Sequence, residues 1–144
     1  MGKKRITRKG AASVDQGLRA RLLSRASKLH LDRGVLTIVA SFNNTIVSLA
    51  DLAGNVVVQA SAGSLGFKGT RKSTPYAAAK AGEVVGERAK QMGVKEVKVI
   101  IKGAGAGRES ALRSFLAFGI DVVSIEDRTP IPHNGPRPRK PRRV

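Results

Sequence analysis

The sequence predicts an α/β domain in which a mixed β-sheet carries two helices. Three β-branched segments follow one another through tight turns, strand and helix patterns then alternate, and glycine or proline marks most boundaries. The chain has 144 residues, 41% of them hydrophobic, which suits one domain with a real core. The expected order is β-β-β-α-β-α-β.

The first three strands are expected to form an antiparallel meander. Residues 35–42 (VLTIVASF) are rich in β-branched side chains, and Asn43–Asn44 supplies a turn because asparagine tolerates left-handed backbone. Residues 45–51 follow, and Gly54 allows a second tight turn before residues 56–62. Turns this short join antiparallel neighbours.

A helix is predicted over residues 75–92. Thr74 is a good N-cap, and Pro75 fits the first helical position, where its missing N–H group has no intrahelical partner to lose. An apolar stripe that begins at Ala77 faces the sheet, and Gly93 ends the helix.

A strand, a helix and a last strand complete the domain. Residues 95–102 are the strand, residues 108–118 the helix with an inward stripe that includes Phe115, and residues 120–127 the last strand. Strand–helix–strand units require parallel pairing. The mixed sheet that results is similar to those of the ribonuclease-H-like group.

The positive charge lies mainly at the two ends of the chain. Lys and Arg number 27 against 10 Asp and Glu, a net charge of +17. Residues 1–34 hold ten bases and two acids, residues 35–127 eleven and eight, and residues 128–144 six and none. We therefore divide the chain into a basic N-terminal extension, a nearly neutral α/β core, and a basic Pro-rich tail.

Part of the N-terminal extension has a helical pattern. Residues 1–12 are a basic arm, and a helix is plausible over residues 14–30 because Leu18, Leu22 and Leu29 share one face. We expect this segment to lie against RNA or against the core.

Composition excludes several classes of protein. The chain has no Cys, so disulfide frameworks and Cys-based metal sites are absent. Its apolar runs are shorter than the ~20 residues of a membrane span, and the N-terminus lacks the apolar core of a signal peptide. A soluble intracellular protein that binds a polyanion is expected, with a purely solubilising tail or a membrane-surface segment as alternatives.

Two loops are candidates for phosphate binding. In residues 63–74 (GSLGFKGTRKST), glycines allow a close backbone approach and three bases supply phosphate contacts; the alternative is a loop without a partner. In the turn 103–107 (GAGAG), backbone N–H groups can face an anion, and Lys102 and Arg108 flank it. The spacing fits neither a dinucleotide turn nor a P-loop, although a plain turn or a free-nucleotide site remains an alternative.

A metal-dependent nuclease is an alternative because ribonuclease-H-like folds often cut nucleic acids with clustered carboxylates. The first strand, where such enzymes need an inward carboxylate, has none. His30 and His133 have no paired ligand spacing. We expect no catalysis, no metal and no cofactor.

Aromatic residues are scarce. Only 3% of the chain is aromatic, whereas single-strand readers stack bases on aromatic platforms. Phe67, between two glycines of a basic loop, is the one aromatic side chain expected to pack on a base or sugar. Recognition of folded RNA by phosphate and shape is therefore predicted.

Four segments closely resemble the universal small-subunit ribosomal protein eleven family, in its bacterial or organellar form. They are SFNNTIV, GSLGFKGTRKSTPYAA, KGAGAGRES and TPIPHNGPRPRKPRRV, at residues 41–47, 63–78, 102–110 and 129–144. The resemblance runs from about Gly34 to Val144. It implies a structural protein of the small-subunit platform that bridges rRNA helices and helps form the cleft of the Shine–Dalgarno duplex, near the mRNA exit.

The resemblance also implies partners and site residues. The neighbours are small-subunit ribosomal proteins seven and eighteen, with mRNA nearby, no membrane and no homo-oligomer, in a cytoplasmic or organellar ribosome. The resemblance and the charge pattern together assign rRNA contact to Asn43, Asn44, Thr45, Gly66, Phe67, Lys68, Gly69, Thr70, Arg71, Lys72, Ser73, Lys102, Gly103, Gly105, Gly107, Arg108, Arg113, His133, Asn134, Gly135, Arg137, Arg139, Lys140, Arg142 and Arg143.

The chain departs from the family pattern at three places. Ala104 and Ala106 stand where the family usually has prolines, which predicts a less rigid turn. Pro136 replaces the usual Cys of the tail, and residues 1–33 align poorly, so no contacts are assigned to them.

Overall fold

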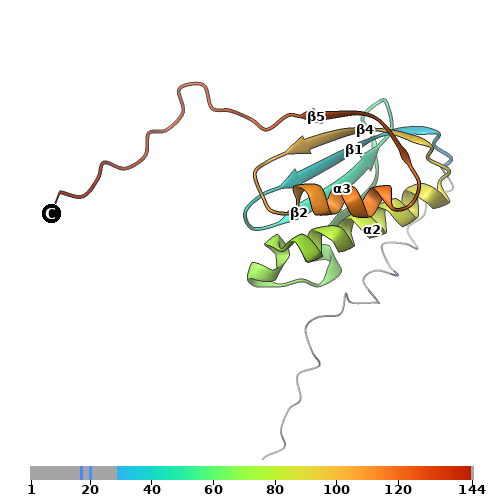
Figure 1. The fold of residues 1–144 in the computed structure, drawn as a ribbon, viewed down its shortest axis with the longest axis horizontal. Helices are drawn as coiled ribbons and strands as arrows, with labels where there is room; N and C mark the ends of the chain where they lie inside the picture. Colours follow the sequence, from blue (N-terminus) through green and yellow to red (C-terminus); the bar gives the residue numbers. More distant parts are fainter. Residues whose placement is uncertain (1–16, 18–19, 21–28, 144) are drawn as a thin grey trace, which may run out of the picture.

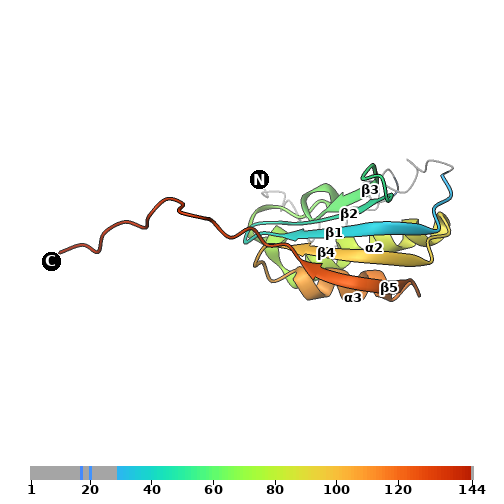
Figure 2. The ribbon, with the colours of Figure 1, turned by 90° about the horizontal axis from the view of Figure 1, so that it is seen from above.

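The computed structural model describes residues 17, 20 and 29–143. Figures 1 and 2 show one sheet with both helices on the same face and a long C-terminal tail that leaves the domain. The strands are β1 (Arg33–Ala40), β2 (Thr45–Ala50), β3 (Val56–Ser61), β4 (Glu96–Lys102) and β5 (Asp121–Asp127). The helices are α2 (Pro75–Gln91) and α3 (Arg108–Leu116), with the 3-10 turns η1 (Gly63–Leu65) and η2 (Gly69–Ser73). The predicted α/β class with a mixed sheet is confirmed.

The strand order is β3-β2-β1-β4-β5. β2 pairs antiparallel with β1 and with β3, whereas β4 pairs parallel with β1 and with β5. β1, β3, β4 and β5 therefore all run in one direction and end at the same edge of the sheet. We call this the loop edge; it comprises residues 41–44, 62–74, 103–107 and the start of the tail at Arg128.

The core lies between the sheet and the two helices. Because side chains alternate between the two faces of a strand, Leu36 and Ile38 of β1 point toward the helices, and both are fully buried. Phe115 of α3 is the largest fully buried side chain and packs in the same cluster. Burial of an aromatic side chain of this size contributes about 1.5–3 kcal/mol, which fixes α3 to the sheet.

Local signals set the ends of α2 as predicted. The Thr74 side chain accepts a hydrogen bond from the N–H group of Ala77 at 3.3 Å, and Pro75 occupies the first helical position. Beyond the helix, Gly93 has a φ of +79°, a conformation that glycine adopts without steric cost.

One predicted segment differs from the structure, and a predicted helix falls mostly on residues that the structure does not describe. The segment 63–74, expected as an irregular loop, contains η1 and η2. The Gly66 N–H group donates to the Gly63 carbonyl at 3.2 Å, and the Ser64 hydroxyl donates to the carbonyl of Ser61 in β3 at 2.8 Å. Within the helix predicted over residues 14–30, the structure describes residues 17, 20, 29 and 30; the first two are helical and the last two are not. The remainder of that helix and the basic arm 1–12 lie outside the described residues.

The two helices approach each other closely at glycines. A Cβ atom built on Gly82 of α2 would lie 2.3 Å from the backbone oxygen of Ala111 in α3. At Gly86, one turn later, it would lie 2.5 Å from the ring of Phe118. The glycines therefore set the helix separation.

We expect Gly82→Ala to destabilise the protein by about 1–3 kcal/mol, because overpacking outweighs the ~1 kcal/mol that alanine gains in helix propensity. Urea unfolding followed by circular dichroism measures this. Gly63→Ala is the matched control: its nearest neighbour would be a lysine side-chain atom at 3.5 Å, so its stability should change by less than about 1 kcal/mol. A Gly82→Ala variant as stable as wild type would contradict the packing argument.

Candidate nucleic-acid interface

The loop edge brings together four segments that are far apart in the sequence. They are the β1–β2 turn, the segment with η1 and η2, the glycine-rich turn before α3, and the start of the tail; in Figure 1 they lie on the left side of the domain. The first three carry residues that the sequence assigns to rRNA, and the tail carries further ones from His133 onward. The parallel course of β1, β3, β4 and β5 is what places them side by side.

Most basic side chains on the loop edge and next to it are exposed to solvent. Lys68 and Arg71 are exposed and Lys72 is half-buried in the segment around η2, and Lys102 is exposed at the end of β4. Arg113 of α3 pairs with Glu109, and its side chain is 81% exposed. An exposed ion pair is worth less than about 1 kcal/mol, so it leaves Arg113 available to a phosphate.

The β1–β2 turn is held by its own serine. The Ser41 hydroxyl accepts hydrogen bonds from the N–H groups of Asn43 and Asn44, and the Ser41 N–H group donates to the Asn44 carbonyl at 2.9 Å. Asn43 is exposed and Asn44 half-buried, whereas Thr45 is only 1% exposed. Asn43 can therefore meet a ligand directly, and Thr45 acts through packing.

The glycine-rich turn packs on β1. The Gly105 N–H group donates to the Ala40 carbonyl at 2.8 Å. A Cβ atom on Gly103 would lie 2.2 Å from the same carbonyl oxygen, and one on Gly105 would lie 2.3 Å from the backbone carbonyl oxygen of Ser41. These glycines permit a close approach of two backbone segments, and the N–H groups of Gly103 and Gly105 donate within the protein, to the Thr129 hydroxyl and the Ala40 carbonyl.

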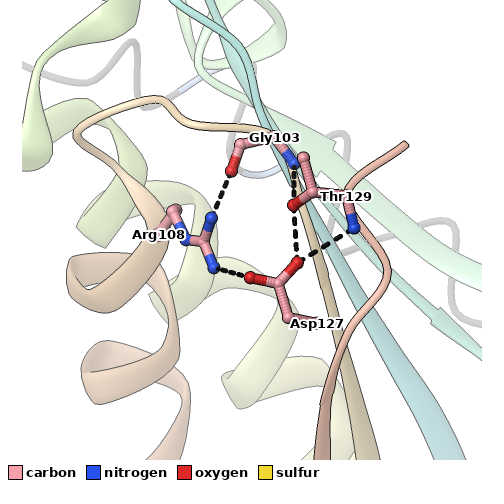
Figure 3. Close-up of polar contacts among 4 residues, drawn as sticks. All are labelled: Gly103, Arg108, Asp127 and Thr129. Carbon is pink, nitrogen blue, oxygen red and sulfur yellow. Dashed lines mark hydrogen bonds and ion pairs between the residues drawn. The ribbon is translucent and has the colours of Figure 1, made fainter. Parts of the chain in front are cut away.

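A polar network joins this turn to the tail (Figure 3). The Arg108 guanidinium donates to the Gly103 carbonyl at 2.6 Å and pairs with the Asp127 carboxylate at 2.5 Å. Thr129 donates its N–H group at 2.9 Å and its hydroxyl at 2.5 Å to Asp127, and its hydroxyl accepts from the Gly103 N–H group at 3.2 Å. The ends of β4 and β5 and the start of α3 are thereby linked.

We expect Asp127 to titrate unusually low. Hydrogen bonds from Thr129, and then from Arg108, lower the pKa of the Asp127 carboxyl from 3.8 to about 2. Because the pKa is lowered in the folded protein, the ionised Asp127 carboxylate stabilises the fold above pH 3.8, and this contribution is lost as the pH falls toward 2. Carboxyl ¹³C chemical shifts measure the titration; Thr129→Val should raise the midpoint and Thr129→Ser should not. A midpoint near 3.8 in wild type would show that the network does not form.

A hollow of about 440 Å³ lies where α3 begins. It is lined by Pro75, Gly105, Ala106, Arg108, Glu109, Ser110 and Arg113. The N-cap of α3, Gly107, provides no side-chain hydrogen bond. The first N–H groups of a helix without such a cap are left for water or an anion.

The structure places two aromatic side chains, Phe67 and Phe42, at the loop edge. Phe67, expected to pack on a base or sugar, is half-buried against the core, and its ring meets Tyr76 edge-on at 6.0 Å. Phe42 in the β1–β2 turn is instead 79% exposed. Sequence reasoning missed Phe42 because it continues an apolar strand; the strand's inward-outward alternation, together with the adjacent Asn-Asn turn, was the available signal.

The tail leaves the domain as an extended segment. Residues 130–143 are exposed and lack regular secondary structure, and Asn134 adopts a φ of +59° in a bend at His133–Asn134. The bases at 137, 139, 140, 142 and 143 therefore extend the positive charge of the loop edge away from the core.

Asp51 and Glu126 make hydrogen bonds and ion pairs within the fold. In the turn at the opposite edge, the Asn55 side-chain amide donates to the Asp51 carboxylate at 2.9 Å and the Asn55 N–H group at 2.8 Å, and these hydrogen bonds lower the pKa of Asp51. Glu126 pairs with Lys98 and Arg128. Among the described residues, three or more potential metal ligands nowhere gather, and no described helix is long and apolar enough to cross a membrane.

A small α/β domain with a basic loop edge and a basic tail belongs to the class of nucleic-acid-binding proteins. The family described as Ribosomal protein S11 matches residues 34–143. The chain therefore belongs to the ribosomal protein S11 family, as the resemblance implied. It is a small-subunit ribosomal protein, a structural component of the ribonucleoprotein that carries out translation, in a family that binds rRNA and other small-subunit proteins.

Proposed function

We propose that this protein binds and bridges rRNA helices of the small-subunit platform and helps form the cleft of the Shine–Dalgarno duplex at the mRNA exit. The observation that carries the proposal is the convergence of four candidate segments on one edge of the sheet. A ligand placed there meets the β1–β2 turn, the segment around η2, the start of α3 and the tail together.

Bridging is supported by two basic surfaces on one rigid core. The segment around η2 carries Lys68, Arg71 and Lys72, and the tail carries five bases beyond Gly135. Figure 1 shows the tail leaving on the β5 side of the sheet, away from the η2 segment. Phosphate contacts position a protein on RNA, so two separated sets of contacts are suited to hold two helices.

The direct contacts are proposed for the exposed residues of the predicted site. Thr45, Gly105 and Gly107 are buried and act by shaping the edge. We further propose small-subunit ribosomal proteins seven and eighteen as neighbours, a monomeric state, and a place in a cytoplasmic or organellar ribosome.

Photo-crosslinking tests the location. A photoreactive residue at position 71 or 102, in small subunits purified through a high-salt wash, should crosslink to central-domain rRNA; the control is position 95 at the opposite edge. Crosslinks from 71 and 102 confined to another rRNA domain would contradict a place on the platform. Loss of the protein in the wash would contradict a structural role.

A further inference from the structure

The polar network around Asp127 connects the tightly packed glycine-rich turn to the exposed tail. Gly103 belongs to a turn packed tightly on β1, whereas Thr129 is the residue from which the exposed tail departs. The Arg128 N–H group also donates to the Ile101 carbonyl at 2.9 Å, so the first two tail residues are bonded to the end of β4. The direction in which the tail leaves is therefore set within the core.

Arg108 is held by contacts within the protein and is less exposed than Arg113 of the same helix. Both of its Nη atoms already donate, one to Gly103 and one to Asp127. Its side chain is 32% exposed, compared with 81% for Arg113 on the same helix. Two of the five N–H donors of the Arg108 guanidinium, one on each Nη, are used inside the protein. Its orientation is therefore set by Gly103 and Asp127 rather than by a phosphate.

We propose that Arg108, Asp127 and Thr129 form a positioning clamp that holds the glycine-rich turn and the tail in their RNA-binding arrangement before RNA arrives. Arg108 is then a positioning residue rather than a phosphate ligand. The inference rests on the proposed function, because it concerns the same interface. Its physical basis is preorganisation: groups already ordered in the free protein lose less entropy on binding.

Substitution of Asp127 tests the proposal, because the clamp and simple electrostatics predict opposite changes in RNA affinity. Simple electrostatics predicts that removing a carboxylate from an RNA-facing edge strengthens RNA binding. The clamp predicts the reverse, because Asp127→Asn weakens the contacts to Arg108 and Thr129 that order the edge. Asp121→Asn is the matched control, since it removes the same charge from the other end of β5.

The probe is a particle reconstituted from small-subunit rRNA and all small-subunit proteins except this one, to which variants of the full chain are bound. Asp127→Asn and Thr129→Val should each weaken binding by about three- to tenfold. Asp121→Asn and Thr129→Ser should stay within about twofold of wild type. Thermal unfolding shows whether each variant is folded, and if Asp127→Asn does not fold, Thr129→Val decides.

The salt dependence separates positioning from phosphate contact. Arg108→Gln should weaken binding without changing the slope of log affinity against log salt, and its effect should not add to that of Asp127→Asn. A slope lower by about 0.9 in Arg108→Gln would make Arg108 a phosphate ligand. Wild-type or tighter binding by Asp127→Asn would overturn the clamp while leaving the proposed function intact, whereas wild-type protein that does not bind the particle would overturn the proposed function itself.

Discussion

Replacing the five tail bases beyond Gly135 with glutamine should greatly reduce the salt dependence of binding to small-subunit particles that lack this protein. Each phosphate contact contributes about 0.7–0.9 to the slope of log affinity against log salt, so five contacts account for about 3.5–4.5. Between ~50 and ~200 mM salt, wild-type affinity should then fall about 130- to 500-fold more than that of the variant. The replaced residues are Arg137, Arg139, Lys140, Arg142 and Arg143.

The design leaves the rest of the interface unchanged. Arg128 is kept because its side chain pairs with Glu126 at 2.7 Å and its backbone bonds to β4. A tail with the same residues in scrambled order is the control, and it should keep the wild-type slope because phosphate contacts do not read sequence. An unchanged slope in the glutamine variant would show that the tail does not bind phosphates.

Gly103→Ala should destabilise the protein by about 2–5 kcal/mol. A φ of +91° costs alanine about 1–2 kcal/mol, and the new Cβ atom, 2.2 Å from the Ala40 oxygen, adds about 1–3 kcal/mol of overpacking. Because an oxygen of the backbone cannot rotate away as a side chain can, the turn itself must move. Chemical denaturation measures the change.

Gly54→Ala separates the two contributions. Gly54 has a φ of +94° and no heavy atom within 4 Å of its Cβ position, so alanine there meets the strain without the clash. It should cost only about 1–2 kcal/mol. If Gly103→Ala instead costs no more than Gly54→Ala but abolishes binding to the particle, the glycine serves the approach of a phosphate and not the packing on β1.

The elements were predictable because their signals are local. The Thr74-Pro75 start of α2, the Asn43-Asn44 turn and the alternation of β1 each depend on residues within a few positions of one another. The two 3-10 turns were missed because no such signal distinguishes them from an irregular glycine-rich loop.

The candidate residues were predictable as types, but their arrangement was not. Gly103 and Gly105 meet Ala40 and Ser41, more than sixty positions earlier, so the sequence could not distinguish a packed turn from a phosphate cradle. Arg108 of α3 pairs with Asp127, 19 positions later at the end of β5. Such pairings follow from strand order, which depends on long-range contacts.

The central claim is that the loop edge, and not the opposite edge, faces rRNA. Because the chain has no Cys, one introduced cysteine gives a single attachment site for an iron chelate that generates hydroxyl radicals. In assembled small subunits, a chelate at Lys72→Cys should cleave central-domain rRNA strongly, and one at Leu52→Cys, which is exposed in the β2–β3 turn, should cleave it weakly. Equal cleavage from the two positions, or stronger cleavage from position 52, would contradict the account.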